Sequence, residues 1–281
     1  MKIGVNTFLW GVHFGPADFH RLAGIKEGGF DGIEFAVLDP KNLPATAIRR
    51  ELERAGLEAT AVSVVPAGMH IGSSDAAVRA RTREHLTACI RQTAEAGATI
   101  LSGPMYSPVG YLTGVRRTAD EWKWGVETWQ ALAPVAADAG VEIGIEPLNR
   151  FETYFLNTAA DGAKFCDAVG HPSIGLLFDT FHANIEEKTV GEALRAAAPH
   201  LKHLHTCEND RGTPGTGHVA WREFFTTLRS IGYDRWMVIE SFGFALGELS
   251  AAAAIWRDLA PTVDSIAFDG VKFLRAQLAA K

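Results

Sequence analysis

The stretch Gly140-Val-Glu-Ile-Gly-Ile-Glu-Pro147 shows the pattern that decides the fold. A helical segment ends at a glycine, a hydrophobic residue follows, and a short apolar run then leads to a polar residue. Glycine is favoured directly after a helix because it adopts the left-handed conformation that closes the last turn. The pattern recurs at Gly29-Phe30 before Gly32-Ile-Glu-Phe-Ala-Val37, Gly56-Leu57 before Ala59-Thr-Ala-Val-Ser-Val64, Gly97-Ala98 before Thr99-Ile-Leu-Ser102, and Gly232-Tyr233 before Trp236-Met-Val-Ile239.

Three further apolar runs complete a set of eight predicted strands: Lys2-Ile-Gly-Val5, Ile174-Gly-Leu-Leu-Phe178 and Leu201-Lys-His-Leu-His205. Helical patterns lie between the strands, for example at 76–96, 119–139, 158–169 and 221–231. Strict alternation of strands and helices predicts a parallel sheet covered by helices. Eight such units favour a closed (β/α)₈ TIM barrel of the α/β class, formed as one domain over residues 1–281 with a C-terminal helical extension over about 250–281.

Composition and charge exclude several other classes of protein. The chain has 281 residues, of which 47% are hydrophobic, so it can form one large core. No apolar run reaches the roughly 18 residues that a membrane helix needs, and the N-terminus lacks a signal-peptide pattern. Three cysteines without CxxC spacing fit a reducing compartment, and we expect a cytoplasmic protein. A net charge of −6 argues against a nucleic-acid partner.

Four potential metal ligands come directly at the ends of four consecutive predicted strands. They are Glu146, Asp179, His205 and Glu240, separated by 33, 26 and 35 positions, each about one strand-helix unit. In a barrel, the C-terminal ends of the strands form the active face. The sequence therefore predicts that the four side chains meet at one rim of the barrel.

Three carboxylates and an imidazole suit one divalent metal ion, of which Mn²⁺ is the one we expect and Co²⁺ or Mg²⁺ are alternatives. Without a cation the carboxylates would repel and raise one another's pKa. His203 shares the inward face of its strand with His205, because side chains alternate along a strand. Since His203 lies deeper, we expect it to be a hydrogen-bonded core histidine.

Three segments of the second half carry a resemblance to a known family. They are Glu146-Pro-Leu-Asn-Arg-Phe-Glu-Thr153, Asp179-Thr-Phe-His-Ala-Asn-Ile-Glu-Glu187, and His205 through Arg211. They resemble the ketose 3-epimerases that act on D-tagatose, D-psicose (D-allulose) or L-ribulose, within the sugar phosphate isomerase/epimerase-like superfamily. The first half is similar to that family only in its strand-helix pattern and in phrases such as Gly29-Phe-Asp-Gly-Ile-Glu34.

The resemblance implies a role for each matching residue. Glu146, Asp179, His205 and Glu240 would bind the metal, and Glu146 and Glu240 would also transfer protons. It implies that the substrate-binding residues are Glu152, His182, Arg211 and Phe242, the last facing the carbon tail of the sugar. It also implies an isomerase that works as a homodimer or homotetramer.

The sequence departs from the family at two places. Family members often read His-x-Gly-Glu after the seventh strand, where this chain has Cys207 in place of the glycine. An aromatic residue expected at the end of the first strand is replaced by Asn6 or Thr7. We expect both changes to touch the wall of the substrate pocket and not the metal ligands.

The positions of the two glutamates favour epimerisation over aldose–ketose isomerisation. Inversion at C3 needs a base on one face of the carbon and an acid on the other. Glu146 and Glu240 follow strands three steps apart around the ring, so they can approach a substrate from opposite sides. A hydroxypyruvate isomerase-like enzyme and an inosose dehydratase-like lyase remain alternatives on the same fold. A nuclease resembling endonuclease IV is disfavoured, because it would need more histidines and a basic surface. A sugar-binding barrel without activity is disfavoured because it would not need all four ligands.

Overall fold

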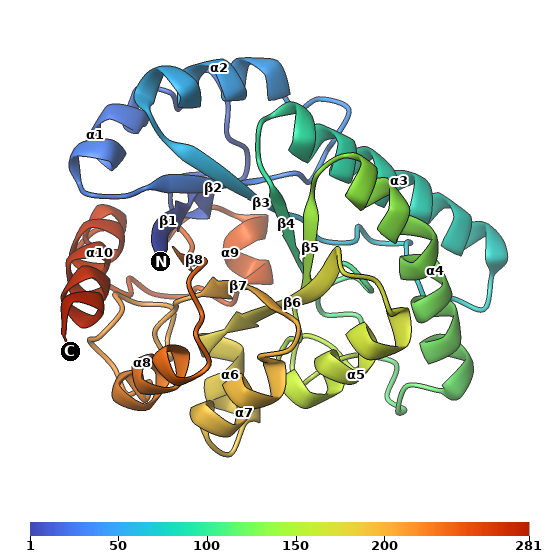
Figure 1. Cartoon of the computed structure of the whole chain (residues 1–281). Coiled ribbons are helices and arrows are strands. Elements are labelled where there is room, and N and C mark those ends of the chain that lie inside the picture. The colour runs from blue at the N-terminus through green and yellow to red at the C-terminus, as the bar shows by residue number, and fades with distance from the viewer. Residues whose placement is uncertain (281) are drawn as a thin grey trace.

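The computed structural model describes residues 1–280, in which eight parallel strands close into a barrel in chain order, each paired with its neighbours and β8 with β1 (Figure 1). This confirms the predicted (β/α)₈ TIM barrel and all eight predicted strands. The strands are β1 (Lys2–Asn6), β2 (Gly32–Ala36), β3 (Glu58–Val62), β4 (Ile100–Gly103), β5 (Glu142–Ile145), β6 (Ile174–Asp179), β7 (Leu201–His205) and β8 (Trp236–Ile239).

An outer ring of helices covers the barrel. These helices are α1 (Arg21–Glu27), α2 (Ala45–Ala55), α3 (Ala76–Glu95), α4 (Ala119–Asp138), α5 (Ala159–Val169), α7 (Val190–Ala197), α8 (Trp221–Ser230) and α10 (Val263–Ala279). Further helices follow the C-terminal ends of strands: η1 (Thr7–Leu9) after β1, α6 (Thr180–Glu186) after β6 and α9 (Glu248–Ala252) after β8. Every helix in the described part of the chain is too short or too polar to cross a lipid bilayer.

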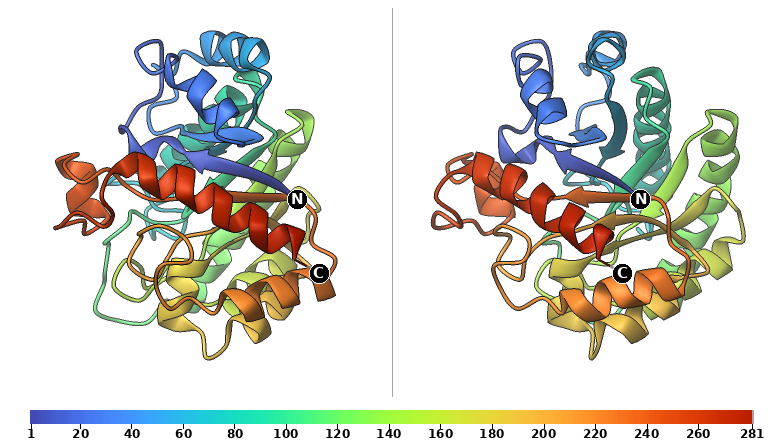
Figure 2. Two further views of the ribbon diagram at one scale, coloured as in Figure 1. Left: turned by 90° about the vertical axis from the view of Figure 1, so that its left-hand side faces the viewer. Right: turned by 60° about the vertical axis from the view of Figure 1, so that its left-hand side comes forward.

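The expected C-terminal helical stretch, about 250–281, contains most of α9 and all of α10, and residue 281 lies outside the described residues. Helix α10 packs against β1 and β8. In Figures 1 and 2 it lies between α1 and α8 and closes the ring of helices. A capping box at Thr262 and Ser265 fixes its start.

The glycines of the sequence pattern adopt the left-handed conformation that was expected at the ends of helices. Gly56 and Gly140, two of the glycines in the sequence pattern, lie just after α2 and α4 in the left-handed conformation, with φ of 64° and 68°. Branched side chains of the strands, such as Ile143, Ile145 and Ile239, are fully buried and belong to one continuous core. The fold therefore holds the strand ends in fixed positions.

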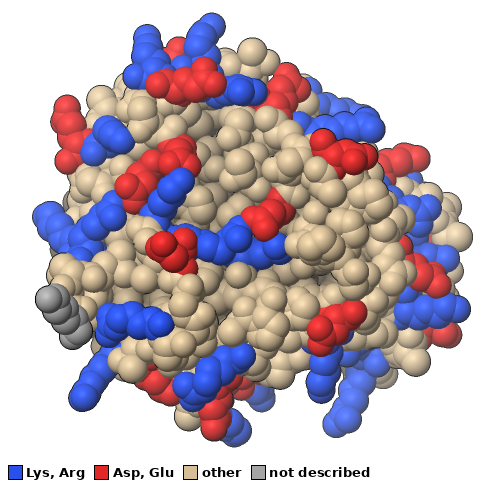
Figure 3. All heavy atoms as spheres, in the orientation of Figure 1, with Lys and Arg blue, Asp and Glu red and all other residues tan. Residues whose placement is uncertain are grey.

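Ion pairs connect charged residues near the N-terminal ends of the strands. Lys202 Nζ lies 2.6 Å from a carboxylate oxygen of Glu142, which also pairs with Arg235. Lys2 pairs with Glu58 in the same way, at 2.6 Å. On the face of the molecule drawn in Figure 3, lysine and arginine side chains alternate with aspartate and glutamate. The ion pairs therefore lie at the end of the barrel opposite to the C-terminal ends of the strands, where the active sites of TIM barrels form.

Candidate active site

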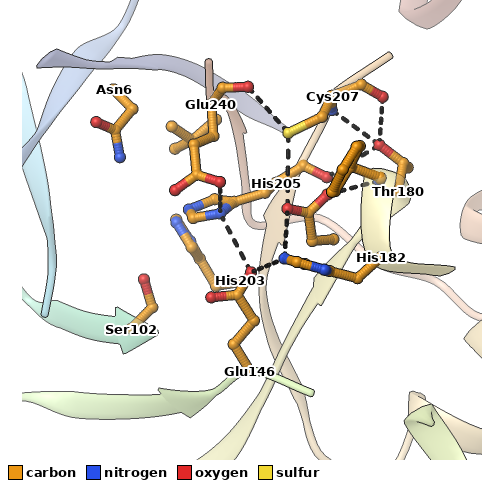
Figure 4. A network of polar contacts seen from close by, with 12 residues as sticks. Asn6, Ser102, Glu146, Thr180, His182, His203, His205, Cys207 and Glu240 are labelled. Atoms are coloured by element: carbon orange, nitrogen blue, oxygen red, sulfur yellow. Dashed lines mark hydrogen bonds and ion pairs between the residues drawn. The ribbon is translucent and has the colours of Figure 1, made fainter. Parts of the chain in front are cut away.

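The four predicted ligands meet at the C-terminal rim of the barrel. Glu146 follows β5, Asp179 ends β6, His205 ends β7 and Glu240 follows β8. All four are buried, and one ligand atom from each lies within 4.8 Å of the others. Strand register explains the convergence, because Asp179 lies beside His205 in the β6–β7 pair. In Figure 4 the carboxylates of Glu240 and Glu146 approach the His205 ring from two sides.

Among the residues that the structure describes, two buried atoms of this cluster have no hydrogen-bond partner: Glu146 Oε1 and His205 Nδ1. Burial, together with the charge of Glu240, holds the pKa of Glu146 well above its usual range. Burial also raises the pKa of Asp179. For Glu240 burial acts in the same direction, but the charges of His205 and Arg211 outweigh it and lower its pKa. A divalent cation fits this set, since it would satisfy the free atoms and offset the repulsion between carboxylates.

Arg211 lies at the centre of the site. Its Nη1 donates to Glu240 Oε2 at 2.6 Å and to Asp179 Oδ2 at 3.1 Å. The guanidinium group also lies over the ring of Phe181, 4.0 Å from the centroid. Arg211 has a φ of 67°, which a non-glycine residue rarely adopts. The sequence resemblance identified Arg211, although its position alone would fit a surface turn.

His182 and Glu152 are held by a residue that the sequence analysis did not single out, Asn149. The backbone N–H of Asn149 donates to His182 Nδ1 at 3.1 Å, and its side-chain amide donates to Glu152 Oε1 at 2.8 Å. Because His182 Nδ1 accepts a hydrogen bond, its proton is on Nε2, which lies 3.6 Å from Glu146 Oε1. Burial lowers the pKa of His182 well below its usual value, so the ring is neutral. Asn149 lies within the Glu146–Thr153 motif that carries the family resemblance, and this motif was the signal in the sequence that could have identified it.

A pocket of about 320 Å³ opens above the cluster. Its polar side is formed by Glu146, Glu152, His182, Arg211 and Glu240. The remaining wall is almost entirely apolar, and its members are Phe8, Val12, Leu38, Val62, Val64, Pro104, Val109, Leu148, Phe242, Leu249, Ala252 and Ala253, together with the carboxylate of Glu248. The structure thus brings all the predicted substrate-binding residues to one pocket.

The two departures from the family pattern lie elsewhere than expected. Asn6 is buried in the barrel and donates to Glu34, while Phe8 provides the aromatic wall and stacks on Phe242 with centroids 5.5 Å apart. Cys207 is also fully buried, and its Sγ donates to the carbonyl oxygen of Glu240 at 2.9 Å. The expectation that both changes touch the pocket wall and not the metal ligands was wrong, because Asn6 contacts Glu34 inside the barrel and Cys207 contacts the predicted ligands Asp179 and Glu240.

Glu34 on β2 is the second residue that the sequence analysis missed. It is fully buried beneath the ligand cluster and contacts His203 and His205. Burial would raise the pKa of Glu34, but the charges and hydrogen bonds of the two histidines lower it well below its usual range. The expected hydrogen-bonded core position of His203 is confirmed. A lone acid within the apolar run Gly32–Ala36 was the signal that could have identified Glu34.

The segment over residues 212–217 consists of turns and bends between β7 and α8. The structure places the buried carboxylate of Glu208 at its base, where Oε2 accepts from the Gly215 backbone N–H at 2.8 Å and from Trp221 Nε1 at 2.9 Å. Oε1 accepts from the Val219 backbone N–H at 3.0 Å. These bonds hold the segment against the barrel end.

Comparisons with known proteins agree with this geometry. The family model described as Xylose isomerase-like TIM barrel matches residues 22–268. A probable ketose 3-epimerase of Synechocystis sp. is 38% identical over 98% of this chain and 96% of that protein. The L-ribulose 3-epimerase of Mesorhizobium japonicum is 36% identical over 92% of this chain and 88% of that protein.

A solved structure of similar shape is the D-allulose 3-epimerase from Methylomonas sp. in complex with D-allulose. It has a TM-score of 0.93 and 30% identity, and the match covers 99% of this chain and 97% of that chain. Similarity in sequence and in structure thus extends over nearly the whole chain. The chain belongs to the ketose 3-epimerases of the Xylose isomerase-like TIM barrel family.

Proposed function

We propose that this protein epimerises a free ketose, a ketohexose or ketopentose, at C3 with the help of one divalent metal ion, and that Glu146 and Glu240 are its acid–base pair. The observation that carries the proposal is the convergence of these two carboxylates on one buried point from β5 and β8. The strands are three steps apart around the closed barrel, so the two groups reach a bound sugar from different sides.

Glu146, Asp179, His205 and Glu240 would hold the ion, for which we propose Mn²⁺, with Co²⁺ or Mg²⁺ as alternatives. When bound, it would stabilise negative charge that develops on the sugar oxygens during proton loss from C3. The donor set of oxygens and one nitrogen supports this choice of metals.

The proton transfers follow from the placement of the glutamates. One carboxylate takes the proton as the C3–H bond breaks, and the electron pair moves toward the C2 carbonyl to give an ene-diolate. The other glutamate, in its acid form, returns a proton to the opposite face of C3, and the C2 carbonyl re-forms. The two carboxyl groups have then exchanged protonation states, which solvent resets before the next turnover.

The other polar residues of the pocket would bind and orient the sugar. His182 is a neutral ring that lines the pocket, with Nε2 3.6 Å from Glu146 Oε1, so its N–H can donate to a substrate oxygen. Glu152 can accept from a hydroxyl, and Arg211 supplies a fixed positive charge. We propose that Phe242 contacts the carbon tail, because its ring lies in the apolar wall with Phe8.

Two observations support free sugars over sugar phosphates. Among the residues described around the pocket, Arg211 is the one lysine or arginine, and it already pairs with Glu240 and Asp179. The glycine-rich segment 212–217 offers little to a phosphate, because the Gly215 N–H is bonded to Glu208. Phosphate sites usually present free backbone N–H groups or basic side chains.

The test is a product analysis with metal-reconstituted enzyme on free ketohexoses, free ketopentoses, their phosphates, hydroxypyruvate and an inosose. We expect C3 epimers of free ketoses, and a higher kcat/KM for ketose phosphates would refute the preference for free sugars. Glu146→Gln and Glu240→Gln each keep a ligating oxygen and remove a proton carrier. Each should lower kcat by about 10²–10⁴-fold or more. Wild-type activity in either variant would contradict the assigned pair.

A further inference from the structure

The fully buried carboxylate of Glu34 joins two histidines that are distant from it in sequence. Its Oε1 lies 2.7 Å from His205 Nε2, and its Oε2 lies 2.8 Å from His203 Nε2. The residues are 171 and 169 positions apart along the chain, so only barrel closure brings them together. Figure 4 shows the His203 and His205 rings next to each other on the inner side of the barrel.

The contact with Glu34 determines which nitrogen of His205 is available to a metal. An ionised carboxylate only accepts hydrogen bonds, so His205 Nε2 carries a proton and donates it to Glu34. The other nitrogen, Nδ1, is buried, has no hydrogen-bond partner in residues 1–280, and lies 3.4 Å from Glu240 Oε2 and 3.8 Å from Glu146 Oε1. The free nitrogen therefore points into the ligand cluster.

We propose that Glu34 is a positioning residue that holds His205 with Nδ1 directed at the metal, and that Asn6 orients Glu34 for this task. The proposal rests on the metal site of the proposed function. A ligating imidazole generally needs such a partner on its second nitrogen, because the partner fixes both the tautomer and the ring orientation.

The surroundings of Glu34 are suited to keep it in one orientation. Asn6 Nδ2 donates to Oε1 at 2.8 Å, and Thr60 Oγ1 donates to Oε2 at 3.0 Å. Ser102 Oγ lies 3.4 Å from Oε2. With the two histidines, donors from β1, β3, β4 and β7 surround the carboxylate on β2. Asn6, which departs from the aromatic residue of the family pattern, thus has a specific polar role here.

A second metal site formed by Glu34, His203 and His205 is the competing interpretation, since their ligand atoms also lie close together. Ligand atoms that share an ion at roughly 2.0–2.2 Å each lie about 3 Å or more from one another. The two histidine–glutamate distances, 2.7 and 2.8 Å, are those of hydrogen bonds. These distances favour one metal site, which Glu34 supports through a hydrogen bond, over a second metal site.

The test compares Mn²⁺ binding by calorimetry for metal-free wild type, Glu34→Gln and the control His203→Gln. The control removes the other histidine from the same network but leaves the partner of His205 in place. Loss of such a partner typically weakens metal binding by about 10–100-fold. We expect a loss of that size for Glu34→Gln and a change of less than about threefold for His203→Gln.

The other outcomes separate the possible errors. If wild type binds no Mn²⁺, the metal site of the proposed function fails. If wild type binds Mn²⁺ and folded Glu34→Gln binds it equally well, the role of Glu34 is wrong. Two ions in wild type and one in Glu34→Gln would overturn the proposal in favour of a second site.

A spectroscopic measurement on wild type keeps the proposal testable should Glu34→Gln not fold. In the Co²⁺-loaded protein, the ligand histidine gives shifted proton signals. We expect its ring N–H proton to exchange slowly with D₂O and to lie close to both carbon-bound ring protons, as a proton on Nε2 does. An N–H proton close to only one of them would be on Nδ1, which would mean that His205 binds through Nε2 and that Glu34 does not position it.

Discussion

Substituting Glu208 by alanine should test how the segment that carries Arg211 is held. The Glu208 side chain is fully buried, and its carboxylate accepts from the backbone N–H groups of Asn209, Gly215 and Val219 and from Trp221 Nε1. Asn209 is half-buried and Gly215 is exposed, so their N–H groups can bond to water after the substitution, whereas Val219 and Trp221 are buried. Each buried donor left without a partner costs about 1–3 kcal/mol. We therefore expect a loss of about 2–6 kcal/mol in the free energy of unfolding.

Equilibrium denaturation in urea measures this loss. Glu27→Ala is a suitable control, because Glu27 is an exposed glutamate on α1 and exposed substitutions usually change stability by less than about 0.5 kcal/mol. Glu208→Gln keeps one acceptor oxygen and should lose less than Glu208→Ala. In both variants KM should rise, because Arg211 lies three residues along the chain. A loss below about 1 kcal/mol in Glu208→Ala would refute the anchoring role.

Further predictions follow from the pocket, the ligand cluster and the cysteines. Removal of the metal with EDTA should abolish activity and Mn²⁺ or Co²⁺ should restore it, so full turnover by metal-free protein would contradict the metal requirement. Metal at 100 times its Kd should also stabilise the fold by about 2.7 kcal/mol. Phe242→Ala removes an aromatic wall and should raise KM by about tenfold, equivalent to about 1.4 kcal/mol, with little change in kcat. Steady-state kinetics would instead show a lower kcat at an unchanged KM if Phe242 acted only in the transition state. All three cysteines are buried, and burial raises the pKa of Cys89 to about 11 and of Cys166 to about 12. A thiol reagent at pH 8 should therefore label them only after unfolding, and rapid labelling of native protein would disprove their burial.

The strand pattern and the four ligands could be predicted because both depend on local sequence. A glycine that closes a helix and an apolar run that follows it are visible within ten residues, and Gly56 and Gly140 have the left-handed conformation that such a signal requires. The polar residue after each run then falls at the C-terminal rim, which is a property of every parallel barrel. Glu146 and Glu240 meet for this reason.

The supporting contacts could not be predicted because they join residues far apart in the chain. Glu34 reaches His205 across 171 positions, and no local pattern specifies which inward-facing residues become neighbours when the barrel closes. Cys207 and Asn6 were assigned to the pocket wall from a family pattern that does not describe side-chain direction. Their burial behind the ligands depends on strand register and packing, which only the three-dimensional structure contains.

The most direct measurement of the proposed chemistry is the position of deuterium in product formed in D₂O. Glu146 and Glu240 acting on opposite faces of C3 require that the original C3 proton be lost and that a solvent proton be returned there. Mass spectrometry and NMR of the product should therefore show deuterium at C3, with C1 still carrying only protium. Deuterium at C1 with an aldose as product would instead show proton transfer between C1 and C2, and would contradict C3 epimerisation by this pair.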